Sequence, residues 1–202
     1  MSSTNPLSWL GYYTVNYPGY YLYTQACDYM QPDESVGKNI TKITQNLYIC
    51  DWATSFNKEL LKAHNITNVV VCVYGLSPRY PNDFKYKTIP LIDSPIEPII
   101  DYFDETNKYI QEVINNGGNV LVHCMCGASR SVSIIAAYII YKGRGNVKPE
   151  IALKYLRSKR KEVNPNTGYI EQLEEYYKRI KNENGQKDEQ EEKMEIREEP
   201  ID

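Results

Sequence analysis

The sequence predicts an α/β fold with a central, mostly parallel sheet flanked by helices. Short β-branched runs alternate with segments of helical periodicity between residues 39 and 181. At 202 residues, 42% of them hydrophobic, the chain can bury one substantial core and has little room for a second. The most apolar segment, residues 132–141, is much shorter than the roughly 20 residues of a bilayer span. We therefore expect it to be a buried helix of a soluble protein.

The predicted elements follow one another in the order that such a fold requires. Apolar, β-branched runs predict strands at residues 43–50, 66–74, 86–92 and 119–123. Helical spacing of apolar residues predicts helices at about residues 56–64, 98–115, 130–141, 148–160 and 167–181. The last strand runs almost directly into the helix that begins at Arg130. Because parallel sheets place ligands at the carboxyl ends of their strands, we expect a site in this connection.

Two terminal segments differ from this body, residues 39–181, in composition. Residues 1–38 are crowded with tyrosine and interrupted by proline and glycine, without a helical or strand period. We interpret them as an irregular arm that packs on the domain, on a partner or in a homodimer. Residues 182–202 hold nine acidic and three basic residues and almost nothing to bury, which predicts a solvated, disordered tail. The rest of the chain is then mildly basic, which suits anionic ligands.

The cysteine and histidine content indicates the compartment and the need for cofactors. Five cysteines, an odd number at irregular spacing with no secretory signal before them, favour a reducing compartment, the cytoplasm. The two histidines, His64 and His123, lie far apart and lack the spacing of metal ligands, so no metal or other cofactor is expected. Any chemistry would then come from the side chains and backbone of the chain itself.

The stretch VLVHCMCGASRS, residues 120–131, combines an apolar strand with cysteine, glycine and arginine. Taken singly, Cys124 and Cys126 could be small core residues, and Gly127 could simply turn the chain. The ordered set favours a site, because a helix N-terminus stabilises a Cys124 thiolate and its N–H groups can surround a phosphate-sized anion. The planar fork of Arg130 can bind two anion oxygens. The predicted phosphate-binding residues are Met125, Cys126, Gly127, Ala128, Ser129 and Arg130.

Within this stretch, VHCMCGASRS resembles the phosphate-binding loop of the cysteine-dependent protein tyrosine phosphatases. Three further segments resemble the dual-specificity branch of that superfamily: NLYICDWATSFNKELLKAHNITNVVVC, IPLIDSP and NPNTGYIEQL. The similarity covers about residues 42–181 and implies the phosphatase fold, with its phosphate-binding loop between a strand and a helix. Cys126 and the tyrosine-rich arm depart from the family's pattern.

The resemblance implies a mechanism. Cys124 would attack phosphorus and form a phosphocysteine intermediate, while the loop amides and Arg130 hold the equatorial oxygens. His123 would hold the loop and help to keep Cys124 ionised, although a purely structural histidine is the alternative. Ser131 would donate a hydrogen bond to the thiolate that leaves in the second step.

A general acid must protonate the leaving oxygen, and three aspartates are candidates. Asp101 and Asp104 fall on the side of their predicted helix away from Phe103 and Ile110, so a solvated surface position is expected. Asp93 ends a strand and enters a loop bounded by prolines, where catalytic groups often lie, and the family match falls on it. We therefore predict that Asp93 is the acid, and the base that activates water in the second step.

None of the variable positions of the loop is Lys or Arg. This observation disfavours a highly anionic substrate, because such a head group would favour positive charge there. We predict a phosphatase acting on phosphotyrosine and phosphoserine or phosphothreonine in proteins, with no nucleic-acid or membrane ligand. The alternatives are a phosphoinositide or RNA 5'-phosphatase of the same fold and a non-catalytic phosphoprotein-binding module. Arg160 and Lys161, interpreted as exposed helix charges, could bind a second phosphate. Cys72 or Cys126 could form a regulatory disulfide with Cys124.

Overall fold

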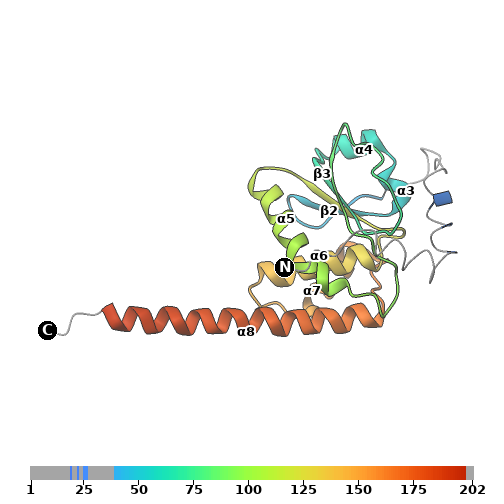
Figure 1. Ribbon diagram of the computed structural model, residues 1–202. Helices are drawn as coiled ribbons and strands as arrows, with labels where there is room; N and C mark the ends of the chain where they lie inside the picture. Colours follow the sequence, from blue (N-terminus) through green and yellow to red (C-terminus); the bar gives the residue numbers. More distant parts are fainter. Residues whose placement is uncertain (1–18, 20–21, 23–24, 27–38, 199–202) are drawn as a thin grey trace.

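The computed structural model describes residues 39–198, together with residues 19, 22, 25 and 26 (Figure 1). Most of the predicted tyrosine-rich arm, residues 1–38, therefore lies outside the described residues. The strands are β1 (Thr41–Lys42), β2 (Leu47–Cys50), β3 (Asn68–Val71), β4 (Lys85–Thr88) and β5 (Val120–His123). The helices that enclose them are α3 (Trp52–Ser55), α4 (Lys58–Ala63), the 3-10 turn η1 (Ile99–Tyr102), α5 (Phe103–Asn115), α6 (Arg130–Lys142), α7 (Pro149–Lys159) and α8 (Thr167–Glu198).

The five described strands form one mixed sheet in the order β1-β2-β5-β3-β4. The strands β2, β5, β3 and β4 run parallel, and β1 is antiparallel to β2. Every residue of β2, β3 and β5 is buried, as expected for parallel strands that are covered on both faces. The register aligns His123 with Cys50 on one side and Val71 on the other, so three strands end side by side. The predicted α/β class is confirmed.

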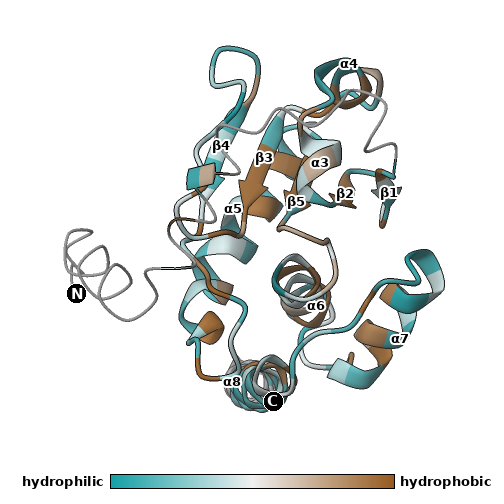
Figure 2. Cartoon of the chain, turned by 90° about the vertical axis from the view of Figure 1, so that its right-hand side faces the viewer, coloured by the Kyte–Doolittle hydropathy of each residue, from teal (hydrophilic) through white to brown (hydrophobic). Residues whose placement is uncertain are grey.

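Helices cover the two faces of the sheet, with α3 and α4 on one face and α5, α6 and α7 on the other (Figure 2). Helix α6 is the centre of the second layer, because it packs against α5, α7 and α8 and nearly all of its residues are buried. This position explains its sequence, which is apolar on every side rather than along one stripe. Since α6 starts directly after the loop that follows β5, the core fixes both ends of that loop.

The structure corrects several predicted boundaries. The predicted strand at 43–50 is in fact the second half of a hairpin of β1 and β2. The helix predicted at 56–64 is present but shorter, as α4, and the short helix α3 before it was not predicted. The side chains of Asp51 and Asn57 each cap one of these helices, so the two remain separate. The helix predicted at 98–115 begins with the tighter turn η1 and continues as α5.

Helix α8 is longer than predicted. The expected helix ended at Lys181 and a disordered tail followed, but α8 continues to Glu198 and projects beyond the rest of the domain (Figure 1). Glu, Lys and Gln, which are abundant in this segment, have high intrinsic helix propensity, so the lack of apolar residues does not prevent helix formation. Within the described part of the chain, no helix combines the length and the apolar character needed to traverse a bilayer.

Candidate active site

The candidate phosphate-binding loop, residues 124–129, connects β5 to α6 and contains every predicted phosphate-binding residue except Arg130, which is the first residue of α6. Gly127 makes the curvature of the loop possible: its φ is 63°, in the left-handed region that favours glycine. A Cβ at this position would lie 2.7 Å from the carbonyl oxygen of Cys50. The sequence suggested that glycine allows the backbone to approach an anion. The structure shows that it also allows the outer side of the loop to pack directly on the end of β2.

Cys124 lies at the floor of this loop, with only 1% of its surface exposed. Its Sγ is 3.1 Å from the Oγ of Ser131. Burial by itself would raise the pKa of the Cys124 thiol. The Arg130 guanidinium, the Ser131 hydroxyl and the N–H groups of Ser131 and Ala128 outweigh burial and hold the pKa below its usual value. The site therefore stabilises the thiolate, which is the nucleophilic form of cysteine.

Arg130 is the first residue of α6, and it is buried. Its Nη1 donates a hydrogen bond to the carbonyl oxygen of Leu91 at 3.2 Å. Its Nε lies 3.6 Å from Oδ2 of Asp93. Both contacts come from the segment that precedes α5, and they orient the planar guanidinium. The structure therefore brings Arg130 and Asp93 together beside Cys124.

His123 ends β5 and is buried. Burial lowers the pKa of this imidazole to about 4, so the ring is neutral at physiological pH. Its Nδ1 lies 3.4 Å from the carbonyl oxygen of Cys124, which can only accept a hydrogen bond. The expectation that His123 helps to keep Cys124 ionised therefore finds no support in its charge. Its contact with the start of the loop fits the structural alternative.

Of the three candidate aspartates, Asp93 lies at the loop. Its Oδ1 accepts hydrogen bonds from Ser129 Oγ at 2.7 Å and from Asn166 Nδ2 at 2.9 Å, and its side chain is 35% exposed. Asp101 is exposed on η1, and Asp104 forms an ion pair with an arginine of α8. Both positions agree with the solvated surface expected for them. In the sequence, Asn166 stands out only as part of NPNTGYIEQL, the segment that resembles the dual-specificity branch.

Arg160 is a site residue that sequence analysis missed. It was expected to be an exposed helix charge that could bind a second phosphate, but it is buried under the loop. Its Nε donates to the carbonyl of Gly127 at 2.9 Å, and its Nη2 donates to the carbonyl of Cys126 at 3.2 Å. The reason is that α7 ends at Lys159, and the extended backbone of Arg160 turns its side chain inward. Lys161 is exposed, as expected.

Two neighbouring carbonyls of the loop are also held from outside it. Trp52 N–H donates to the Met125 carbonyl at 3.0 Å, and Asn164 N–H donates to the Ala128 carbonyl at 2.8 Å. Since the N–H and C=O of one peptide group point in nearly opposite directions, carbonyls turned outward leave N–H groups facing the inside of the loop. That inner surface is suited to the oxygens of a phosphate.

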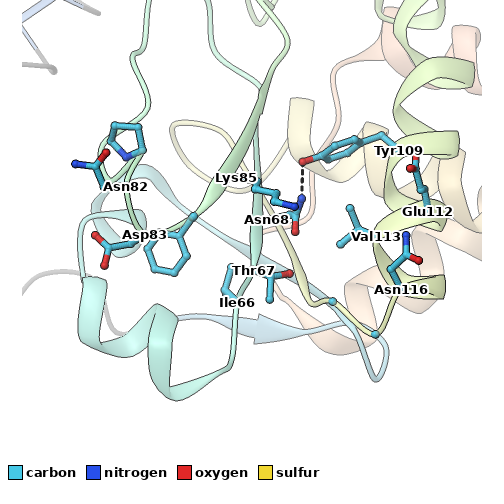
Figure 3. Close-up of a pocket in the computed structure, with 14 residues that line it drawn as sticks. Ile66, Thr67, Asn68, Asn82, Asp83, Lys85, Tyr109, Glu112, Val113 and Asn116 are labelled. Carbon is cyan, nitrogen blue, oxygen red and sulfur yellow. Dashed lines mark hydrogen bonds between the residues drawn. The ribbon is translucent and has the colours of Figure 1, made fainter.

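A separate cavity of about 720 Å³ opens at the other end of the sheet (Figure 3). It lies at the start of β3 and β4, where Asn68 donates to the Tyr109 hydroxyl at 2.7 Å. The phosphate-binding loop follows the carboxyl end of β5, so this cavity is distinct from the candidate site. The loop and its surroundings, rather than this cavity, contain the reactive groups.

The strand order places three cysteines close together. Cys50 ends β2, Cys72 follows β3, and Cys124 follows β5, which lies between those strands. The Cys72 N–H donates to the carbonyl of His123 at 2.9 Å. Burial, together with the nearby Cys124, raises the pKa of the Cys72 thiol well above its usual value. Cys72 is therefore a protonated neighbour of the thiolate, whereas Cys126 is exposed on the loop.

A strand, a loop with a buried low-pKa cysteine, and a helix that begins with a buried arginine define the class of cysteine-dependent phosphatases. Comparisons with known proteins specify the branch. The family model "Dual specificity phosphatase, catalytic domain" matches residues 47–179. The chain belongs to this family, and it is a dual-specificity protein phosphatase, a hydrolase.

Individual relatives agree with this assignment. The chain is 43% identical to dual specificity protein phosphatase 1B of Arabidopsis thaliana over 145 residues, which cover 71% of this chain and 85% of that protein. The crystal structure of DUSP15 is similar with a TM-score of 0.67 and 29% identity, covering 73% of this chain and 95% of that one. The human tyrosine phosphatase-like serine/threonine/tyrosine-interacting protein is 30% identical, with a TM-score of 0.64 over 68% of this chain and 94% of that one.

The contacts of Arg160 lead to a first prediction. Replacing it in the variant Arg160→Lys keeps the charge but removes the planar set of donors, and buried carbonyls without donors cost about 1–3 kcal/mol each. We expect the loop to lose its shape and kcat/KM for an aryl phosphate to fall about tenfold or more. The exposed neighbour supplies the control, because Lys161→Ala should have the activity of the parent enzyme. Full activity in Arg160→Lys would show that the loop keeps its shape without this arginine.

A second prediction concerns oxidation. Mild peroxide should convert the Cys124 thiolate to a sulfenic acid, and the neighbouring Cys72 thiol should displace water from it to form a disulfide that a thiol reductant reverses. Peptide mass spectrometry should find the Cys72–Cys124 link in the parent, and recovery of activity should decline in Cys72→Ser. A disulfide between Cys124 and the exposed Cys126 would contradict the prediction, because it would show that the adjacency of the strands does not determine which cysteine reacts. Absence of any modification at Cys124 would contradict the thiolate itself.

Proposed function

We propose that this protein hydrolyses phosphotyrosine and phosphoserine or phosphothreonine in proteins, with Cys124 as the nucleophile and Asp93 as the general acid. The observation that carries the proposal is the buried Cys124 sulfur, whose pKa is held low by Arg130, Ser131 and loop amides against the effect of burial. Binding an anion requires positive charge alone. A stabilised thiolate is needed to form a covalent bond with phosphorus.

In the first step, Cys124 Sγ attacks phosphorus in line with the leaving oxygen. A sulfur–phosphorus bond forms as the bond from phosphorus to the substrate oxygen breaks. The loop amides and the Arg130 guanidinium bind the equatorial oxygens, whose charge they stabilise in the transition state. The Asp93 carboxyl, which lies beside Arg130 at the rim, gives its proton to the departing oxygen.

In the second step, water attacks the phosphocysteine from the side that the product left. Asp93, now a carboxylate, accepts a proton from this water, and the sulfur–phosphorus bond breaks. Cys124 leaves as a thiolate, and the Ser131 hydroxyl, 3.1 Å from Sγ, donates a hydrogen bond to it. Inorganic phosphate is released, and the enzyme returns to its starting state.

The electrostatics of the loop support phosphoprotein substrates over more anionic ones. Its side chains at Met125, Cys126, Ala128 and Ser129 carry no charge. The buried Arg160 is engaged with loop carbonyls, so it supplies no binding site for a second phosphate. A phosphoinositide or an RNA 5'-triphosphate would gain little here beyond one phosphate. A non-catalytic binding module is disfavoured because binding requires neither a low-pKa thiol nor a nearby carboxyl.

The cellular setting follows from the same thiolate. A low-pKa cysteine survives as a free thiolate in a reducing compartment, and we place this activity in the cytoplasm. Phosphorylated proteins are the partners that the proposal requires. A contact of the tyrosine-rich arm with a partner or in a homodimer is a prediction that lies outside the described residues.

The nucleophile is tested directly by removing its sulfur. We expect Cys124→Ser to lose phosphatase activity, because a serine hydroxyl remains protonated in a site that stabilises a thiolate. Vanadate, a phosphate analogue, should inhibit the parent enzyme, and a metal chelator should leave its turnover unchanged because the loop and Arg130 supply the charge. Retention of phosphate release by Cys124→Ser, or loss of turnover in chelator, would contradict the mechanism.

The acid is tested by varying the leaving group. The variant Asp93→Asn should hydrolyse phosphotyrosine peptides about 10²-fold more slowly, which is the usual contribution of a positioned acid. The loss should be greater for phosphoserine, whose alkoxide is a poorer leaving group, and smaller for an activated aryl phosphate that leaves without a proton. Asp101→Asn is the matched control and should change none of these rates. Equal losses for all leaving groups in Asp93→Asn would mean that the acid is another residue.

A further inference from the structure

The loop that carries Asp93 rests on the first two turns of α8. The Tyr169 hydroxyl donates to the carbonyl of Ile92 at 2.6 Å, and Gln172 Nε2 donates to the carbonyl of Glu97 at 2.9 Å. Between these contacts the two backbones touch, because a Cβ on Gly168 would lie 1.9 Å from the carbonyl oxygen of Pro95. The position of the loop is therefore set by α8, a helix that begins more than seventy residues further along the chain.

Asn166 is the residue through which α8 reaches the Asp93 carboxyl itself. Its Nδ2 donates to Asp93 Oδ1 at 2.9 Å. Its Oδ1 accepts from the N–H of Tyr169 at 2.9 Å, which caps the N-terminus of α8. Its backbone N–H donates to Ser129 Oγ at 3.3 Å, and that hydroxyl donates to the same oxygen of Asp93. One residue thus links the helix end and the carboxyl through its side chain and the phosphate-binding loop through its backbone N–H.

The chemistry of this link requires an amide. Asp, Ser and Thr cap a helix about as well as Asn does, but none of them offers the N–H donor that the carboxylate accepts here. An aspartate would place a second negative charge beside Asp93. The half-exposed Asp93 side chain has water as a competing partner, so a fixed donor restricts it to the rotamer that faces Arg130.

We propose that Asn166 is a positioning residue that holds the Asp93 carboxyl where it can protonate the leaving oxygen. This inference rests on the proposed role of Asp93 as the general acid. Asn166 acts through Asp93 and does not contact the phosphate. Its effect should therefore appear only in reactions whose leaving oxygen needs a proton, and only while Asp93 is present.

The test uses a variant that keeps the helix cap and removes the donor. In Asn166→Ser the serine hydroxyl still caps α8, so the melting temperature should stay close to that of the parent. We expect kcat for phosphotyrosine and phosphoserine peptides to fall about tenfold, because one charge-assisted hydrogen bond is lost while that of Ser129 remains. The rate with an activated aryl phosphate should change less than twofold.

Two further variants separate positioning from structure. Asn182 is exposed on the same helix, about four turns from Asn166, and has no role in the site, so Asn182→Ser should match the parent on every substrate. In the Asp93→Asn background, Asn166→Ser should cause no further leaving-group-dependent loss. A loss of equal size for all leaving groups, parental rates in Asn166→Ser, or a full additional tenfold loss in the double variant would each overturn the inference.

The same variants distinguish a failure of this inference from a failure of the proposed function. If Asp93→Asn shows the graded loss and Asn166→Ser does not, the acid is correct and its position does not depend on Asn166. If Asp93→Asn shows no graded loss, the acid assignment itself fails, and the role of Asn166 fails with it.

Discussion

A negative charge on the buried Cys124 sulfur is the constraint around which this site is arranged. Burial opposes ionisation, so the thiolate needs donors that lie close and cannot move away. Arg130 and Ser131 provide two of them, and both belong to the first turn of α6. That turn is fixed because α6 is packed on every side at the centre of the domain. The reactivity of one atom therefore depends on the burial of a whole helix.

The loop around this charge creates a second requirement: its carbonyl groups need hydrogen-bond donors. Turning N–H groups inward to bind an anion turns C=O groups outward, and each needs a donor from another part of the chain. The donors come from the start of α3, from Arg160 after α7 and from the backbone of Asn164. Arg160 also reaches the carbonyl of Asn39, just before β1. The outer side of the loop is thus held by segments that are far apart in the sequence.

Helix α8 connects these two features to Asp93, the proposed general acid. Its N-terminus lies next to the loop through Asn166, and its first two turns support the segment that carries Asp93. Further along, Tyr176 is buried against Phe103 and accepts a hydrogen bond from Asn107, which joins the same helix to α5. The proposed mechanism needs Cys124 and Asp93 at a fixed separation. Here β5 with α6 holds Cys124, and α8 holds Asp93.

The sequence by itself determined the α/β class and the strand–loop–helix of residues 120–131, because both follow from local patterns. It also singled out Cys124 and Arg130 as candidates, because one loop links them and each residue type has its own chemical task. Asp93 could be proposed because it lies in a proline-bounded loop. The strand expected to end beside it stops at Thr88, so Asp93 lies within the loop and not at a strand end. A local pattern also gave a wrong expectation after residue 181. Glu, Lys and Gln with almost no apolar residues suggested a disordered tail, whereas α8 continues there because these residues have high helix propensity.

Tertiary structure alone decided the roles of residues whose contacts are distant in the sequence. Arg160 looks like any helix-end cation in sequence, because its partners are backbone carbonyls, which leave no mark on the residue types at positions 126 and 127. His123 is neutral because of burial, and burial results from packing rather than from neighbours in sequence. Asn166 and Asp93 are 73 residues apart. Their contact exists because the core brings α8 beneath the loop after β4, and no local pattern contains that information.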